Sequence, residues 1–447
     1  MASTYLTRTP ASAGNQKTYT FSCWVKRSAI STGVINGLFV GQNTSATEIT
    51  GFRFSTSDAI EFGTFSGGWD WQLVTNRVFR DTSAWYHIVF AVDTTQATSS
   101  DRAKLYINGV QETSFSTETY PSLNFDTDVN TTNLHVVGAA IFNSVIEHLD
   151  GSMAHVHFID GTAYDADTFG ETDATTGIWK PKTAPSVTYG TNGFFLKFEN
   201  SGAFGTDSSG NANNFTVNGT MTQTIDTPSN VFATLNPLDK DLTGTLATYS
   251  YGNNRFSSSG NSTSNNGTRC TLGASSGKYY WEVKNVQNAL LLGIQDADAL
   301  TRFTSSWTWG LTGTYAVKHD GEKSINGTQT SSAVPTFTNG DILMLAMDLD
   351  NSKLYFGKNG TWSNSGDPTS GATGTGSIGD LVSGTTYIPV VSNSNWSQNT
   401  IADFNFGNGY FGTTAVASAG TNASGIGIFE YDVPTGYTAL STKGLNL

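Results

Sequence analysis

Apolar and polar residues alternate along most of this chain, which is the pattern of β-strands with one buried face. The longest alternating stretches are 18–28, 85–93 and 103–110 in the first half, and 277–283 and 340–350 in the second. Asn-Gly and Asp-Asn pairs follow several of these stretches and are strong hairpin signals. The pattern contains no amphipathic helix longer than a turn or two. The sequence therefore predicts an all-β protein.

The spacing of the predicted strands divides the chain into two sandwiches. The length of 447 residues leaves room for two or three cores. Shorter strand patterns complete the first series, with a loop at 67–71; they are 35–41, 51–55, 59–65, 134–140 and 152–159. A further apolar strand at 193–198 is expected to join the first sandwich from a connecting segment at 160–235. We predict two tandem antiparallel β-sandwiches, residues 1–235 and 236–447.

Four motifs of the first half are similar to those of a known sandwich. They are the strand at 21–25, Trp85-Tyr86-His87 with Asp93 at the end of the same strand, the hairpin at 105–109, and Leu149-Asp150-Gly151-Ser152-Met153-Ala154. Together they resemble the laminin-G/concanavalin-like lectin fold. The resemblance implies a jelly roll of two curved sheets.

The second half resembles a SPRY (B30.2-type) domain. The residues that carry this resemblance are 277–283, 291–294, 339–350, 353–362, 387–391 and 403–407, with an ending at Pro434-Thr435-Gly436-Tyr437-Thr438-Ala439-Leu440. The resemblance implies a second sandwich with a ligand surface built from loops at one end. It points to loops near 295–310 and 357–372.

The segment 158–237 resembles one that is common in structural proteins of tailed bacteriophages, especially marine and cyanobacterial ones. The stretches that carry it include 158–161, 169–172, 176–182 and 189–198. The resemblance implies a virion protein made in the host cytoplasm, and a homo-oligomer, with a trimer as the usual form for fibres. The first ten residues lack the apolar region of a signal peptide, and no stretch approaches a membrane span, so neither secretion nor membrane insertion is expected.

The charge balance bears on the partners. The net charge is −13, only 13% of residues are charged, and no window clusters Lys and Arg. A nucleic-acid-binding surface is therefore not expected. The two cysteines, Cys23 and Cys270, lie in different predicted domains and cannot form a disulfide framework.

A search for catalytic motifs argues against an enzyme. A jelly-roll glucanase needs Glu-x-Asp-x-x-Glu, and Glu171 and Asp173 are followed by Thr176 where the second Glu should stand. His155 and His157 have the spacing of zinc ligands, but Val156 and Phe158 are expected in the core, which would turn the imidazoles to solvent. We expect no cofactor, although a Ca²⁺ ion held by loop carboxylates such as Asp93 or Asp150 stays open.

Aromatic residues in predicted loops are the candidate binding residues. Indole faces stack on sugar rings and anchor interfaces, and here they stand beside Asp, Asn and Ser. The alternative is that these indoles cap the ends of the sandwiches as part of the core. The candidate ligand-binding residues are Trp69, Asp70, Trp71, Asp296, Trp307, Trp309, Trp362 and Trp396.

The sequence therefore predicts a non-enzymatic virion surface protein, on a tail fibre, tailspike or head decoration, that binds a host-surface glycan or receptor. The first alternative is a purely structural decoration or assembly protein that binds other virion proteins. The second is a glucanase-type hydrolase. No heptads or collagen-like repeats are present to build a long fibre stem.

Overall fold

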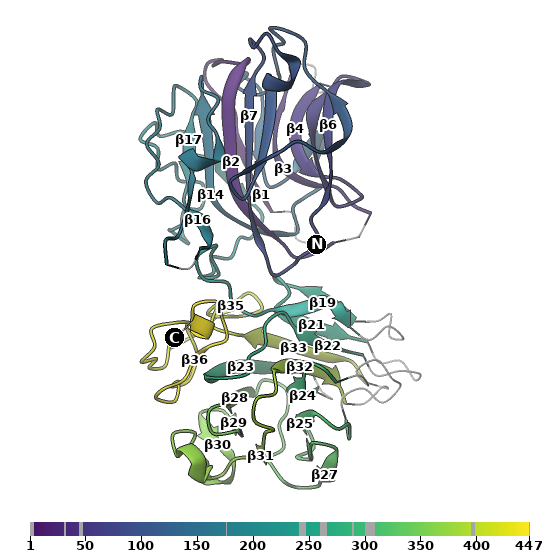
Figure 1. The fold of residues 1–447 in the computed structure, drawn as a ribbon, viewed down its shortest axis with the longest axis vertical. Helices are drawn as coiled ribbons and strands as arrows, with labels where there is room; N and C mark the ends of the chain where they lie inside the picture. The colour runs from purple at the N-terminus through teal and green to yellow at the C-terminus, as the bar shows by residue number, and fades with distance from the viewer. Residues whose placement is uncertain are drawn as a thin grey trace. The chain divides into compact units, whose positions relative to one another are not determined.

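The computed structural model describes residues 4–30, 33–43, 48–175, 177–240, 247–259, 266–287, 290–299, 309–394 and 398–446. The chain forms two compact units, Met1–Gln223 and Thr224–Leu447 (Figure 1). Both consist of β-sheets, and the helices among the described residues are five 3₁₀ turns of three residues each. The predicted all-β fold with two antiparallel sandwiches is confirmed.

The first unit contains an eight-stranded and a six-stranded sheet. The larger sheet has the order β10 (Phe115–Thr119), β6 (Trp69–Val78), β5 (Ala59–Phe65), β4 (Ile49–Phe54), β3 (Asn36–Gln42), β11 (His135–Val137), β1 (Tyr5–Arg8), β18 (Thr216–Asn218). The smaller has the order β17 (Phe194–Leu196), β14 (Gly151–Asp160), β2 (Thr18–Arg27), β7 (Trp85–Asp93), β8 (Ala103–Ile107), β9 (Val110–Glu112). A 3₁₀ turn, η1 (Ser99–Asp101), precedes β8.

Stacked phenylalanines fill the space between these two sheets. Phe21 of β2 lies 4.7 Å, centroid to centroid, from Phe39 of β3, and Phe52 of β4 lies 4.2 Å from Phe90 of β7. All four side chains are at most 1% exposed. Alternate residues of each strand point to one face, so the apolar positions of the sequence pattern meet in one core.

The connecting segment covers the outer face of the six-stranded sheet. Its elements are η2 (Ala166–Thr168), β15 (Gly170–Thr172), β16 (Trp179–Pro181) and β17, which pairs with β14 as expected for 193–198. Phe169 and Trp179 pack over Val89 of β7. His157 is only 1% exposed, and its Nδ1 lies 2.9 Å from the Tyr189 hydroxyl. The expectation that His157 faces solvent is wrong, because this segment forms a third layer over the sheet.

The second unit also packs two sheets face to face. The seven-stranded sheet has the order β19 (Leu235–Lys240), β22 (Gly267–Cys270), β32 (Tyr387–Asn393), β24 (Leu290–Asp296), β25 (Thr314–Lys318), β26 (Lys323–Ile325), β27 (Thr328–Thr330). The main path of the other sheet is β20 (Ala247–Ser250), β21 (Arg255–Ser258), β33 (Thr400–Asn405), β23 (Lys278–Gln287), β28 (Ile342–Asp348), β29 (Lys353–Lys358), β30 (Thr361–Trp362). The short strands β31 (Gly379–Asp380) and β36 (Thr438–Ala439) pair with β29 and β23.

Smaller elements complete the two units. In the first, β12 (Ala140–Phe142) and β13 (Ser144–Ile146) form a hairpin. In the second, β34 (Tyr410–Phe411) pairs with β35 (Thr414–Ala415), and the remaining 3₁₀ turns are η3 (Ser363–Ser365), η4 (Gly371–Thr373) and η5 (Gly444–Asn446).

The division between the units falls twelve residues before the predicted domain boundary at 235/236. Phe232 and Leu235 are at most 1% exposed and belong to the core of the second unit, together with Trp281 and Phe406. The segment 224–235 therefore packs with the second unit.

Candidate functional site

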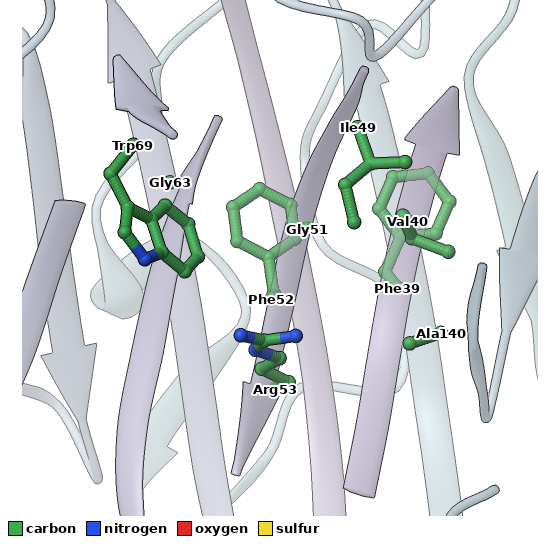
Figure 2. Close-up of a pocket in the computed structure, with 9 residues that line it drawn as sticks. All are labelled: Phe39, Val40, Ile49, Gly51, Phe52, Arg53, Gly63, Trp69 and Ala140. Atoms are coloured by element: carbon green, nitrogen blue, oxygen red, sulfur yellow. The ribbon is translucent and has the colours of Figure 1, made fainter. Parts of the chain in front are cut away.

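A shallow hollow lies on the outer face of the eight-stranded sheet, opposite the phenylalanine core. Outward-facing residues that alternate with the inward-facing Phe52 and Phe62 form much of its lining. Two of them are Gly51 and Gly63, which have no side chain to cover the strand backbone. Its lining residues are Phe39, Val40, Ile49, Gly51, Phe52, Arg53, Gly63, Trp69 and Ala140 (Figure 2). The volume of about 10 Å³ is room for about one water molecule, so this is a surface depression and not a deep cavity.

A β-bulge decides which tryptophan faces this hollow. In the pairing of β5 with β6, Thr64 is opposite Trp71 and Phe65 is opposite Trp69, which leaves Asp70 as the extra residue. The bulge turns Trp69 to the outer face, where it is 37% exposed, while Trp71 points inward at 0%. The Trp71 Nε1 donates to Thr64 Oγ1 at 2.8 Å. Trp71 is therefore a core residue, and the predicted binding role for it is wrong.

The predicted loop at 67–71 needs the same correction, because Trp69 to Trp71 begin strand β6. Asp70 is exposed at the bulge and accepts a hydrogen bond from Ser66 Oγ at 2.8 Å. Gly63 is required beside the bulge, because a Cβ there would lie 2.2 Å from the Trp71 carbonyl oxygen. This close approach fixes the indole of Trp69 over a bare strand.

Arg53 brings a guanidinium to the hollow. Its Nη2 lies 3.3 Å from Glu61 Oε1, and its Nη1 lies 3.5 Å from Glu147 Oε2. The guanidinium carbon is 5.4 Å from the centroid of the Trp69 ring, within cation–π range. Gln72 Nε2 donates to the same Glu61 oxygen at 2.7 Å. Polar groups thus stand beside an exposed indole face.

The β12–β13 hairpin adds apolar surface to this region. Phe142 of the hairpin is 44% exposed, and its ring meets that of Phe65 edge-on at 6.1 Å. Phe65 in turn meets Trp69 edge-on at 5.6 Å. We call the surface formed by Gly51, Arg53, Gly63, Phe65, Trp69 and Phe142 the Trp69 face.

The Trp69 face has the parts that carbohydrate binding needs. A half-exposed indole offers a flat apolar surface for the C–H face of a sugar ring, and Arg53, Glu61 and Gln72 offer donors and acceptors for hydroxyls. The depression is shallow, so each sugar would be only partly buried. Single-site binding of that kind is weak and gains strength from several copies.

The candidate residues of the second half belong to the second unit, and three of them are described. Trp362 is half-buried against Tyr280 and Tyr355, at ring-centroid distances of 6.3 and 6.5 Å, so it belongs largely to the core. Trp309 is half-buried, with Lys318 Nζ 4.5 Å from its ring centroid.

Asp296 ends β24 and accepts a hydrogen bond from the Asp298 backbone N–H at 2.9 Å. This is a turn-forming contact. Trp307 and Trp396 lie outside the described residues, so their binding roles stay predictions.

A buried Ser–His pair in the first unit lacks the arrangement of a catalytic base. Ser22 Oγ lies 2.9 Å from His87 Nε2, and Trp179 Nε1 donates to His87 Nδ1 at 3.0 Å. Indole N–H is a donor only, so Nδ1 is the acceptor and Nε2 carries the proton. Burial lowers the pKa of His87 to about 3. His87 therefore donates to Ser22 and is not placed to accept its proton.

A second hollow of about 280 Å³ lies at the edge of the first unit, between β8, β9 and β10. Its lining includes the carboxylates of Asp101, Glu112 and Glu118. Arg77 Nε lies 3.1 Å from Glu112, and the Tyr120 hydroxyl donates to Glu118 at 2.9 Å. Its two aromatic rings, Phe115 and Tyr120, pack against the core, so it offers no free stacking surface like that of Trp69.

Within the described parts of the chain, no group of three or more His, Cys, Asp and Glu side chains could hold a metal ion. Asp93 instead accepts hydrogen bonds from Thr18, Thr95 and Gln96, which lower its pKa against the opposing effect of burial. Burial raises the pKa of Asp150. None of the helices described has the length and apolarity to cross a membrane.

Sequence reasoning singled out Trp69, with Asp70 next to it, but missed the other members of the Trp69 face: Gly51, Arg53, Gly63, Phe65 and Phe142. A signal was present in the sequence: Gly51 and Arg53 alternate with Phe52 and Phe54, and Gly63 alternates with Phe62. Glycine at an outward strand position marks a close approach of another group. The register between the consecutive strands β4, β5 and β6 brings Gly51, Arg53, Gly63 and Trp69 together, and Phe142 is added by a hairpin that is distant in the sequence.

Residues 2–168, within the first unit, match the family model described as the concanavalin A-like lectin/glucanases superfamily, of laminin G type. The first sandwich therefore has a concanavalin A-like fold, as the sequence motifs predict. The family name joins lectins with glucanases, which is consistent with carbohydrate binding. No curated protein matches the chain.

Solved structures with similarity include the SPRY domain of human HERC1, at 16% identity and a TM-score of 0.30 over 38% of this chain and 96% of that one. The TRIM65 PSpry domain is similar at 13% identity and a TM-score of 0.30, over 38% of this chain and 89% of that one. Stonustoxin is similar at 19% identity and a TM-score of 0.29, over 39% of this chain and 27% of that one. The SPRY type was the expectation for the second half, whose sandwich is established by its own two sheets.

Proposed function

We propose that this protein is a non-enzymatic carbohydrate-binding protein that recognises glycans through the Trp69 face. The observation that carries the proposal is an indole that is 37% exposed beside Arg53, Glu61 and Gln72, over a strand surface left bare by glycine. This arrangement sits on a concanavalin A-like sandwich. Neither the buried Ser22–His87 pair nor the engaged carboxylates of the second hollow favours a hydrolase.

The proposal extends to the surface of a tailed-phage virion, as a tail fibre, tailspike or head-decoration protein acting as a homo-oligomer. The phage-like segment 158–237 supports this placement, and the shallow Trp69 face supports multivalent use. Detection of the chain in purified phage particles by mass spectrometry, with antibody labelling to locate it, tests the placement.

Binding of the full-length protein to a glycan array tests the site. Trp69→Ala removes the stacking surface and is expected to weaken binding about tenfold or more while the fold persists. Gly51→Ala is a steric probe: its Cβ would meet Val40 Cγ2 at 3.5 Å, an ordinary contact, yet it narrows the hollow. Val110→Ala, at a residue 65% exposed on β9, is the control and is expected to leave binding unchanged.

The purely structural alternative predicts a different outcome. A decoration or assembly protein would bind no glycan and would instead bind other virion proteins, and Trp69→Ala would not change glycan-array signals. Turnover of a β-glucan would contradict the non-enzymatic part of the proposal.

A further inference from the structure

Arg53, the cation of the Trp69 face, already forms ion pairs with two carboxylates of the protein. Arginine in a ligand site commonly recruits a ligand carboxylate through paired hydrogen bonds. Here Arg53 Nη2 lies 3.3 Å from Glu61 and Nη1 lies 3.5 Å from Glu147, so protein groups hold both ends of the guanidinium. Figure 2 shows Arg53 and Trp69 among the residues that line the hollow.

The local charge is negative despite Arg53. Glu61 and Glu147 outnumber it, and Asp70 lies next to Trp69 in the bulge. Glu61 is 7% exposed and receives hydrogen bonds from both Arg53 and Gln72. Burial raises the pKa of Glu147, and so does the nearby Glu61 carboxylate, whereas the Arg53 charge lowers it.

We infer that the Trp69 face selects uncharged sugars and rejects sugars that carry a carboxylate. This inference rests on the proposed function and names its ligand class. A ligand carboxylate would compete with Glu61 and Glu147 for Arg53 and would lie beside the negative charges of both, which opposes its binding. Sugar hydroxyls meet no such conflict, because they donate to the carboxylate oxygens without separating the ion pairs.

The experiment compares matched sugar pairs on the full-length protein by titration calorimetry or saturation-transfer NMR at pH 7. The probes are glucose with glucuronic acid and galactose with galacturonic acid, which differ only at C6. The neutral member of a pair is expected to bind about tenfold or more tightly than its uronic acid. This ratio is expected to shrink as salt is added, because the repulsion is electrostatic.

Glu147→Gln keeps the side-chain shape and removes one negative charge. We expect it to raise uronic-acid affinity more than neutral-sugar affinity, narrowing the ratio by about threefold or more. Glu199→Gln, at an acidic side chain 75% exposed, is the control for which the ratio stays unchanged.

The outcomes separate the two proposals. If uronic acids bind as tightly as their neutral partners and Trp69→Ala abolishes both, the charge inference is wrong while the proposed function stands. If sugars bind but Trp69→Ala changes nothing, the Trp69 face is not the site and both fail. If none of the four sugars binds, the charge inference is refuted, and the proposed function is refuted with it when the glycan array also shows no binding.

Discussion

Glu282 couples the stability of the second unit to pH. This β23 side chain is 0% exposed and accepts hydrogen bonds from the backbone N–H groups of Glu430 and Tyr431, each at 2.8 Å, and from the Tyr280 hydroxyl at 2.9 Å. Burial raises the pKa of Glu282 to about 7, against the lowering effect of these hydrogen bonds and of Asn405. The carboxylate thereby joins the C-terminal segment to the sheet.

The sign of the pH effect follows from where the proton is held. The folded unit keeps the Glu282 proton up to about pH 7, whereas the ordinary value for the unfolded chain is 4.5. This residue therefore adds stability at low pH, and that contribution is lost as the pH rises from 4.5 through 7. At about 1.4 kcal/mol per pKa unit, the contribution is of order 3 kcal/mol.

Glu282→Gln removes the titration and disrupts one hydrogen bond. The amide oxygen can accept from one backbone N–H, but the NH₂ group faces the other N–H as a second donor. An unsatisfied buried donor costs about 1–3 kcal/mol, or about 5- to 150-fold in the local opening equilibrium.

Hydrogen exchange followed by mass spectrometry on peptides covering 428–440 measures this opening in the full-length protein. In Glu282→Gln we expect the amides of Glu430 and Tyr431 to exchange faster. We also expect the opening free energy to lose the part of its variation between pH 4.5 and 7 that the titration of Glu282 causes. Glu199→Gln, with its side chain 75% exposed, is the isosteric control. An unchanged pH dependence in Glu282→Gln, after correction for intrinsic exchange, would refute the reasoning.

Two further predictions concern the first unit. Burial lowers the pKa of His87 to about 3 from 6.5, so the unit should lose stability as the pH falls below 6.5, by up to about 1.4 kcal/mol per pH unit from this residue. His87→Gln should reduce that slope in urea unfolding between pH 7.5 and 4.5, and an unaltered slope would contradict the assignment. Arg27 Nη2 lies 3.0 Å from Asp58 Oδ1, with the two side chains 1% and 3% exposed, and the more exposed Arg80 Nε lies 2.9 Å from Asp58 Oδ2. Because Arg80 still pairs with Asp58, Arg27→Met should cost about 3 kcal/mol, at the low end for a broken buried pair. Adding Asp58→Asn should recover part of that loss in denaturant titrations, and a cost of the single variant below about 1 kcal/mol would show the pair to be unimportant.

Part of the candidate site was predictable because it is local in sequence. Trp69 and Asp70 stand out as an aromatic–acid pair after two glycines. Nothing local distinguishes Trp69 from Trp71, because they share strand parity and would face the same way in a regular strand. The bulge opposite Thr64 and Phe65 separates them, and its position depends on the register of β5 against β6.

The remaining members of the site are brought together by strand register and by one distant hairpin. Glu61 is paired with Arg53 across β4 and β5, and Glu147 follows the β12–β13 hairpin, far away in the sequence. His157 is another example. The alternating pattern correctly predicted that Val156 and Phe158 face the core, but a later segment that includes Tyr189 buries His157 on the opposite face of the sheet. Whether a side chain is buried depends on whether another segment packs on its face of the sheet, and the alternating pattern of one strand does not show this.

The sequence by itself determined the all-β class and the positions of many of the longer strands, because period-two alternation and turn residues act within a few neighbours. The motifs of the first half also resemble those of the concanavalin A-like fold that the first sandwich has. Only the tertiary structure decided which indole is exposed, which carboxylates hold Arg53, and which histidines are buried. These features arise from strand register, a bulge and a covering layer. Register and bulge are set by how neighbouring strands pair, and the covering layer comes from a later segment, so an alternating pattern within one strand specifies none of them.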